Sequence, residues 1–87
     1  MNMKELLAAI PEVNRQLVKE HVADIKIAQH TPRTMFVILI LNDGFEVYGA
    51  SSCADLDNFS EDLGVEYAFR HASARLYNHV NKYVDNQ

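Results

Sequence analysis

The run of seven apolar residues from Met35 to Leu41 limits most strongly what this chain can fold into. Successive side chains of an extended strand point to opposite faces, so this strand carries apolar groups on both of its faces. Neither face can comfortably lie against water, and each therefore needs a cover. The run predicts a strand over Thr34 to Leu41 with packing elements, or another subunit, on two sides.

Alternating patterns on either side of this run predict two more strands. Residues 25–29 alternate apolar with polar or small side chains before a turn at Thr31-Pro32-Arg33. Asn42-Asp43-Gly44 is typical of a tight turn, because Gly44 and its neighbours tolerate positive φ. Residues 45–50 then alternate again. The chain from residue 25 to residue 50 therefore predicts a three-stranded antiparallel meander.

Helical patterns precede and follow the predicted sheet. Between Met3 and Val22 the apolar residues recur every three or four positions, which is typical of an amphipathic helix. Pro11 predicts a break or restart near Ile10, so one bent helix or two short ones both fit. A long final helix is expected to begin near Asn58, with Glu61 at capping-box spacing. Its predicted inward stripe is Val65, Ala68, Phe69, Ala72, Leu76, Val80 and Tyr83.

Together these elements predict a single α+β domain over residues 1–87, with an N-terminal helical segment, a three-stranded antiparallel meander and a long C-terminal helix. A chain of 87 residues has no room for a second core. The final helix can cover only one face of a three-stranded sheet well. This area argument favours a homo-oligomer in which another subunit covers the second face. The alternative is a monomer with one helix on each face.

Composition excludes several classes of protein. The chain carries 12 acidic and 8 basic side chains, a net charge of −4, which disfavours a nucleic-acid binder. Its single cysteine, Cys53, excludes an internal disulfide framework and fits a reducing compartment. The longest apolar run is far shorter than the roughly 20 residues that a membrane-spanning helix needs, and the N-terminus lacks a signal peptide's pattern. We therefore expect a soluble cytosolic protein without membrane association.

No motif predicts catalysis, a cofactor or a metal site. Cys53 and one of the four histidines could be imagined as a nucleophile and its base, but nothing fixes a third, orienting group. His71 and His79 lie near one side of the predicted helix with Arg75 between them, and a cation there would repel a metal ion. The acidic stretch from Asp55 to Asp62 lacks the glycine and glutamate spacing of a calcium-binding EF-hand. We expect no enzymatic activity.

Binding without catalysis has more support. The candidate ligand-binding residues are Tyr48 for stacking, Ser51 and Ser52 for phosphate or ribose, and Arg70 or Arg75 for phosphate. Arg70 and Arg75 fall on opposite flanks of the predicted helix, so one monomer cannot bring both to one site. The ordinary structural alternative is that Arg70 pairs with Glu66, four residues earlier, while the tyrosines cover a subunit contact.

An ordered set of residues carries a family resemblance. It runs from Leu41 through Gly44-Phe45-Glu46-Val47-Tyr48-Gly49 to Cys53, and continues with Asn58-Phe59, Gly64, Ala68 and Ala72. This pattern resembles the gene-49/gene-66 family of small tailed-phage proteins, over roughly Ile25 to Tyr83. Two positions depart from it: Asp43-Gly44 replaces the usual Asn-Gly turn, and Tyr77 stands where the family commonly has tryptophan.

The resemblance implies a phage accessory protein made in the cytoplasm of an infected bacterial host, in a family without an enzymatic signature to transfer. Small phage proteins often disarm host defence, and some act as oligomeric sponges for cyclic nucleotides; this is an analogy. The leading hypothesis is non-enzymatic counter-defence by sequestering a host cyclic nucleotide immune signal. The alternative is a protein–protein inhibitor of a host defence or metabolic enzyme, which would dock the acidic loop Asp55 to Asp62 or an exposed helical face.

Overall fold

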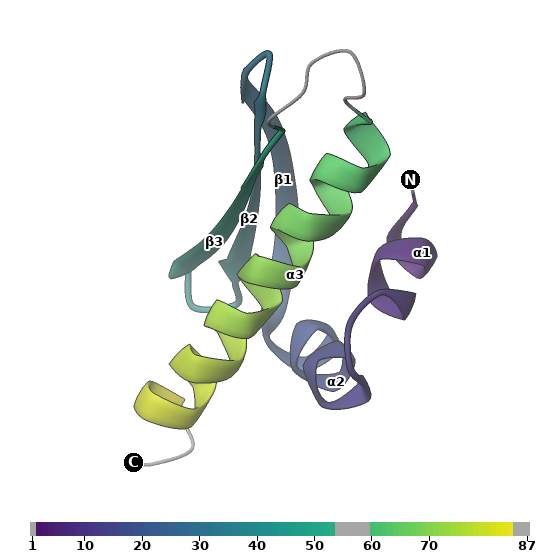
Figure 1. Cartoon of the computed structure of the whole chain (residues 1–87). Helices are drawn as coiled ribbons and strands as arrows, with labels where there is room; N and C mark the ends of the chain where they lie inside the picture. The colour runs from purple at the N-terminus through teal and green to yellow at the C-terminus, as the bar shows by residue number, and fades with distance from the viewer. Residues whose placement is uncertain (1, 54–59, 85–87) are drawn as a thin grey trace.

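The computed structural model describes residues 2–53 and 60–84, with an α+β fold of the predicted order (Figure 1). This confirms the predicted fold class: N-terminal helices precede a three-stranded antiparallel sheet, and a long helix follows it. The elements are α1 (Met3–Ala8), α2 (Glu12–His21), β1 (Val22–Thr31), β2 (Thr34–Leu41), β3 (Glu46–Ser52), α3 (Glu61–His79) and the π-helical turn η2 (Val80–Val84).

The N-terminal helical segment is two short helices, broken at the proline. Pro11 is the residue that precedes α2, where its missing N–H costs no helical hydrogen bond. The guanidinium of Arg15 spans the break and donates a 2.9 Å hydrogen bond to the carbonyl of Ile10. Asn2 caps α1 by accepting a 2.9 Å hydrogen bond from the N–H of Glu5. The break near Ile10 is therefore confirmed, in its two-helix form.

The three strands form one antiparallel sheet in the order β1-β2-β3. In the middle of the sheet Val37 pairs with Ile27 on one side and with Gly49 on the other. Gly44 has the positive φ, +88°, that the turn between β2 and β3 requires. Both outer strands are longer than predicted, because β1 begins at Val22 and β3 continues to Ser52.

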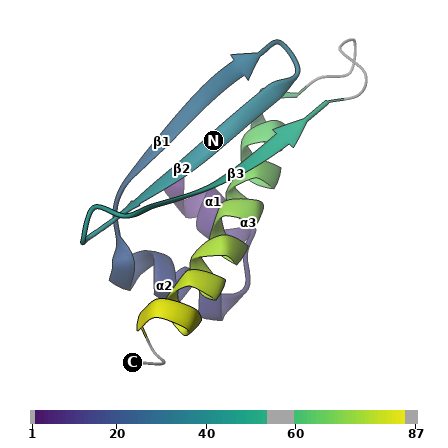
Figure 2. The same ribbon diagram turned by 90° about the vertical axis from the view of Figure 1, so that its left-hand side faces the viewer.

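All helices lie on the same side of the sheet, as Figure 2 shows by viewing the sheet with the helices behind it. Burial along β2 alternates strictly as a result. Its helix-facing residues are buried and the others are only half-buried; the buried ones are Met35, Val37, Leu39 and Leu41. We call the helix-covered side of the sheet the closed face and the other side the open face. The alternative arrangement with one helix on each face is therefore wrong.

The long helix α3 lies directly against β3 on the closed face. A methyl group at Gly49 would collide with the backbone of Ala68 and Ala72, so glycine is required for this close approach. The predicted inward stripe from Val65 to Val80 is buried, while the side chain of Tyr83 lies outside those described. The predicted cap at Asn58 is wrong: α3 begins at Glu61, and Ser60 accepts a hydrogen bond from the N–H of Leu63 at 3.4 Å. Asn58 itself lies outside the described residues.

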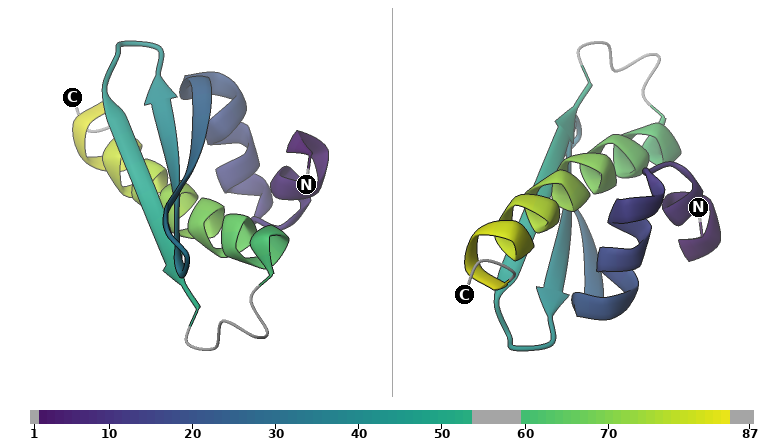
Figure 3. Two further views of the ribbon diagram at one scale, coloured as in Figure 1. Left: turned by 90° about the horizontal axis from the view of Figure 1, so that it is seen from above. Right: turned by 90° about the horizontal axis from the view of Figure 1, so that it is seen from below.

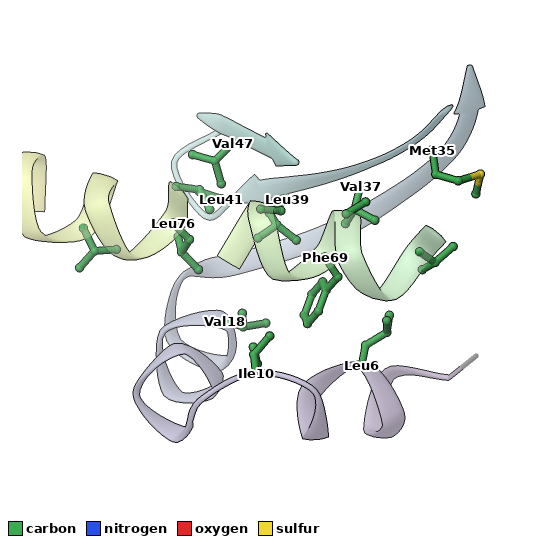
Figure 4. Close-up of a cluster of buried hydrophobic side chains, with 14 residues drawn as sticks. Leu6, Ile10, Val18, Met35, Val37, Leu39, Leu41, Val47, Phe69 and Leu76 are labelled. Carbon is green, nitrogen blue, oxygen red and sulfur yellow. The ribbon is translucent and has the colours of Figure 1, made fainter. Parts of the chain in front are cut away.

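The N-terminal helices complete the core beside α3 rather than over the open face (Figure 3). Leu6, Ile10 and Val18 join the same apolar cluster as Phe69, whose ring lies between the sheet and α1 (Figure 4). One buried polar contact also joins α2 to α3. The side-chain amide of Asn14 donates to the carbonyl and to the hydroxyl of Ser73, at 3.2 and 3.4 Å.

Candidate functional site

The open face of the sheet keeps an apolar centre that residues 2–53 and 60–84 do not cover. Phe36, Ile38 and Ile40 of β2 point to this side and are half-buried by their neighbours on β1 and β3. Antiparallel sheets with one solvated face normally place polar residues there. The surrounding side chains on this face include Asp24, Lys26, Ala28, Glu46, Tyr48, Ala50 and Ser52. An apolar centre with a polar rim is typical of a binding surface.

Aromatic rings form a row across this face. The ring of His30 meets Phe36 edge-on at a centroid distance of 5.6 Å, and Phe36 lies 6.1 Å from the ring of Tyr48. Beyond Tyr48, the guanidinium carbon of Arg75 lies 4.9 Å from the ring centroid. We call these four residues the aromatic row. It crosses all three strands and places Arg75 at one end and His30 at the other.

Arg75 belongs to α3 on the closed side, yet it contacts a ring on the open face. The explanation lies at the outer edge of β3, where the Nδ1 atom of His71 is 2.8 Å from the carbonyl oxygen of Ala50. Arg75 is one helical turn further along α3 and so reaches past this edge to Tyr48. Within residues 2–53 and 60–84, no carboxylate pairs with Arg75. Its charge is therefore available to an anionic ligand.

The structure brings together only part of the predicted ligand-binding set. Tyr48 and Arg75 are in contact, and Ser52 lies exposed on the same face four residues further along β3. Ser51 points to the closed side, where its hydroxyl donates a 2.6 Å hydrogen bond to the carbonyl of Gly64. Ser51 and Ser52 therefore lie on opposite faces of the sheet, because adjacent residues of a strand face opposite ways, and among the candidate residues only Ser52 shares the open face with Tyr48.

Arg70 forms the ion pair with Glu66 that the sequence offered as the alternative to ligand binding. Its guanidinium lies 3.3 Å from the carboxylate of Glu66, one turn earlier on α3, and 5.6 Å from the ring centroid of Tyr67. These contacts are on a different flank of α3 from the Arg75–Tyr48 pair, as the helical spacing predicts. The two arginines therefore form a natural pair for comparison: one ion-paired within its helix, the other placed against the open face.

A separate small cavity lies where β3 ends and α3 begins. Its volume is about 220 Å³, below the range of about 300–1,000 Å³ that is usual for small-molecule pockets. The lining residues in the described part of the chain are Ser51, Ser52, Cys53, Ser60, Leu63, Gly64 and Tyr67. Ser52 alone belongs both to this lining and to the open face. The cavity by itself is too small to hold a dinucleotide.

The side chains considered for catalysis make separate contacts in the part of the chain that the structure describes. Cys53 is half-buried in the cavity wall, and its N–H donates to the carbonyl of Arg33 at 2.8 Å. The histidines contact other groups: His79, for example, stacks on Phe45 with ring centroids 4.4 Å apart. Among the described residues, no three His, Cys, Asp or Glu side chains are grouped to hold a metal ion. Nor is any described helix long and apolar enough to cross a membrane.

Electrostatics on the β1 side of the open face come from one exposed ion pair. The ammonium group of Lys26 lies 3.2 Å from the carboxylate of Asp24. The hydrogen bond from Lys26 lowers the pKa of Asp24, and a second hydrogen bond from the N–H of Ile25 adds to the effect. This pair neutralises itself, whereas Arg75 has no carboxylate partner among the described residues.

Phe36 and His30 are site residues that reasoning from the sequence missed. The sequence indicated Phe36 only as part of a strand with two apolar faces, and it gave His30 no role beyond being one of four histidines. The register, in which Ala28 and Ala50 flank Phe36, makes room for both outer rings to reach it. The available signal was the alternation in β2 itself, which already separates Phe36, Ile38 and Ile40 from the buried set.

Fold and site together define a small α+β protein with a helix-covered sheet face and an exposed, aromatic-rich one. The sequence profile of the phage protein (N4 Gp49/phage Sf6 gene 66) family matches residues 9–80, and the chain belongs to this family. The match spans α2, the whole sheet and α3, so it includes every residue of the aromatic row. No curated protein and no solved structure matches the chain.

Proposed function

We propose that this phage-family protein counters a host defence by sequestering a cyclic nucleotide immune signal on the open face of its sheet. The single observation that carries the proposal is the Arg75–Tyr48–Phe36 arrangement. Nucleobases stack on aromatic side chains, and phosphate groups bind guanidinium groups. The aromatic row offers both kinds of contact side by side.

The overall charge favours a small nucleotide over a nucleic acid. A net charge of −4 opposes a long polyanion, whose binding depends on neutralising many phosphates. A ligand with few phosphates responds mainly to the local charge of Arg75. The proposed mode is binding without cleavage in the cytoplasm of the infected bacterium, with Tyr48 stacking on a base, Arg75 at a phosphate and Ser52 within the same surface.

The two arginines of α3 give a matched test. Native mass spectrometry of the protein with a panel of cyclic di- and oligonucleotides should show the added mass of one intact nucleotide. Arg75→Ala should raise the dissociation constant, measured by calorimetry, about 10- to 100-fold, as expected for the loss of a charge-assisted contact. Arg70→Ala removes the same charge from the same helix, but from the Glu66 pair, and should bind like the wild type.

Two results would contradict the proposal. One is that no cyclic nucleotide adds to the folded wild-type protein. The other is that both arginine variants remain folded and bind with unchanged affinity. Equal losses in the two variants would point to general charge rather than to the aromatic row, and would also overturn this site.

Inhibition of a host protein is the second candidate, and one observation favours it. Ile38 and Ile40 give the open face apolar area that a nucleotide does not need and that protein interfaces bury at their centres. Ile38→Lys should then abolish a stoichiometric host complex. Of the acidic loop considered for this role, Asp55 and Asp57 lie outside the described residues, and Asp62 lies in the first turn of α3. Neutralising all three acids tests that loop separately.

A further inference from the structure

The outer edge of β1 is the most exposed backbone edge of the sheet that the structure describes. Nearly every residue of this ten-residue strand is exposed, and the strand pairs only with β2. The opposite edge, β3, lies under α3, with His71 at the carbonyl of Ala50. A long strand with an open edge is a template for pairing with another strand.

Hydrogen bonds fix which backbone groups of β1 point outward. Leu41 bonds with the β3 side, since its N–H donates to the carbonyl of Phe45 at 2.8 Å. Alternate residues of an antiparallel strand bond to opposite neighbours, so Ile40 and Ile38 bond toward β1. Their partners are Asp24 and Lys26, which leaves the backbone groups of Ile25, Ile27 and Gln29 directed away from the sheet. The N–H of Ile25 agrees with this, because it donates to the side chain of Asp24 at 2.8 Å.

Apolar surface accompanies this edge on the helix side. Ile27 is 48% exposed although it shares a face with the core residues of the sheet. Next to it, a groove of about 380 Å³ runs between the N-terminal helices and β1, lined in part by Met3, Leu7, Val18, Val22 and Ile25. Open hydrogen-bonding groups and uncovered apolar side chains thus occur along the same border of the molecule.

We propose that β1 pairs antiparallel with β1 of a second copy of this chain, giving a two-fold dimer with a continuous six-stranded sheet centred on Ile27. In this register Ile27 faces Ile27 and Ile25 faces Gln29, so three directly opposed pairs form about six backbone hydrogen bonds. The two that the Ile25 N–H groups donate replace their bonds to Asp24. The edge of β1 shares only His30 with the aromatic row, and the proposed dimer does not depend on the proposed function.

Strand overlap and like-charge repulsion select this register. Centring on Ile27 lets residues 23–31 pair, whereas centring on Ile25, which would place Asp24 opposite Lys26, lets only residues 22–28 pair. With Ile27 at the two-fold axis, Asp24 lies opposite His30 of the second copy, and Lys26 lies opposite its Ala28. A register centred on Lys26 would oppose two lysines, which is unfavourable. The turn at Pro32 of the second copy comes beside Val22, at the end of the groove. The strand is therefore complementary to itself, as a two-fold interface requires.

Sedimentation and cross-linking test the dimer and its register. Wild-type protein should sediment as a dimer, and Ile27→Lys should raise the dimer dissociation constant at least about tenfold by placing two charges at the axis. Ile38→Lys, on the open face, should leave the dimer intact.

In the proposed register Lys26 and Ala28 form a non-hydrogen-bonded pair about 4.5 Å apart, within disulfide range. In a Cys53→Ser background, oxidising a mixture of Lys26→Cys and Ala28→Cys chains should give covalent dimers, whereas either variant alone should give few.

The outcomes separate this proposal from the proposed function. A wild-type protein that sediments as a monomer at all concentrations, or a dimer lost in Ile38→Lys but kept in Ile27→Lys, would overturn the β1 interface. Efficient cross-linking of Lys26→Cys alone would overturn the register. Cyclic nucleotide binding is read separately on the Ile27→Lys protein, and the aromatic row predicts that it persists there.

Discussion

The closed and open faces of the sheet are built from the same three strands but differ in how far their apolar side chains are buried. On the closed face, alternate residues of β2 such as Val37 and Leu39 are fully buried under α3. On the open face, their immediate neighbours Phe36 and Ile38 are equally apolar and remain half-exposed. The apolar residues of β2 thus divide into one face that stabilises the fold and one that the described residues leave half-exposed.

The largest effect is expected where the closed face is tightest. Gly49→Ala places a methyl group against the backbone of α3, which cannot move aside without shifting the helix. The free energy of unfolding should fall by about 3 kcal/mol or more. Ala50→Val adds bulk at the next residue, on the open face, and should change the free energy of unfolding by less than about 1 kcal/mol. Urea denaturation measures both, and similar values for the two variants would contradict the division between the faces.

A matched truncation on β2 compares the faces directly. Leu39→Ala leaves a cavity in the fully buried core and should cost about 3 kcal/mol of unfolding free energy. Ile38→Ala removes a half-exposed side chain next to it and should cost only about 1 kcal/mol. Equal losses in thermal or urea unfolding would mean that the open face is already covered in solution, for example by another copy.

The polar contact beneath the closed face should matter less than the apolar core. Asn14→Ala leaves the buried hydroxyl of Ser73 without its amide partner, which should cost about 1–2 kcal/mol. Asn42→Ala removes an exposed 2.9 Å hydrogen bond to the carbonyl of Glu20, which water can replace, and should cost under about 1 kcal/mol. The reverse order of the two losses in urea denaturation would contradict the burial assigned to Asn14.

The smallest effect is expected from the exposed ion pair on the open face. The pKa of Asp24 is lowered from its ordinary value of 3.8 in the folded protein, so its contribution to stability is present above that pH. The contribution is lost as the pH falls through the lowered, folded-state value. Asp24→Asn should therefore be slightly less stable than wild type at pH 7, and the difference should disappear in strong acid. Thermal melts at both pH values test this, and a difference that grows on acidification would contradict it.

Local signals in the sequence predicted much of the fold. Pro11 marked the break between helices, Gly44 marked the hairpin turn, and the alternation of residues 45–50 marked β3. The cap of α3 was misplaced because Ser60, closer to the helix, competes with Asn58 for the same role. The strand ends were missed because Val22 fits a helical pattern equally well, and only pairing with Leu41 places it in β1.

The candidate site was less predictable, because it depends on register and on the position of α3. Helical spacing separated Arg70 from Arg75 but could not tell which arginine would lie beside Tyr48. That choice follows from Gly49, which brings α3 against β3 and carries Arg75 past the strand edge. Phe36 and His30 come together only through long-range pairing of β1 with β2, which a local pattern does not specify.

Nucleotide binding by the open face can be tested by mapping amide chemical shifts of the ¹⁵N-labelled protein during titration with cyclic di- and oligonucleotides. We expect at least one nucleotide to shift the resonances of Phe36, Ile38, Tyr48 and Arg75 on the open side, while those of Val37 and Leu39 respond less. Shifts confined to the cavity near Ser60, Gly64 and Tyr67, or no shifts with any nucleotide, would contradict a nucleotide-binding open face.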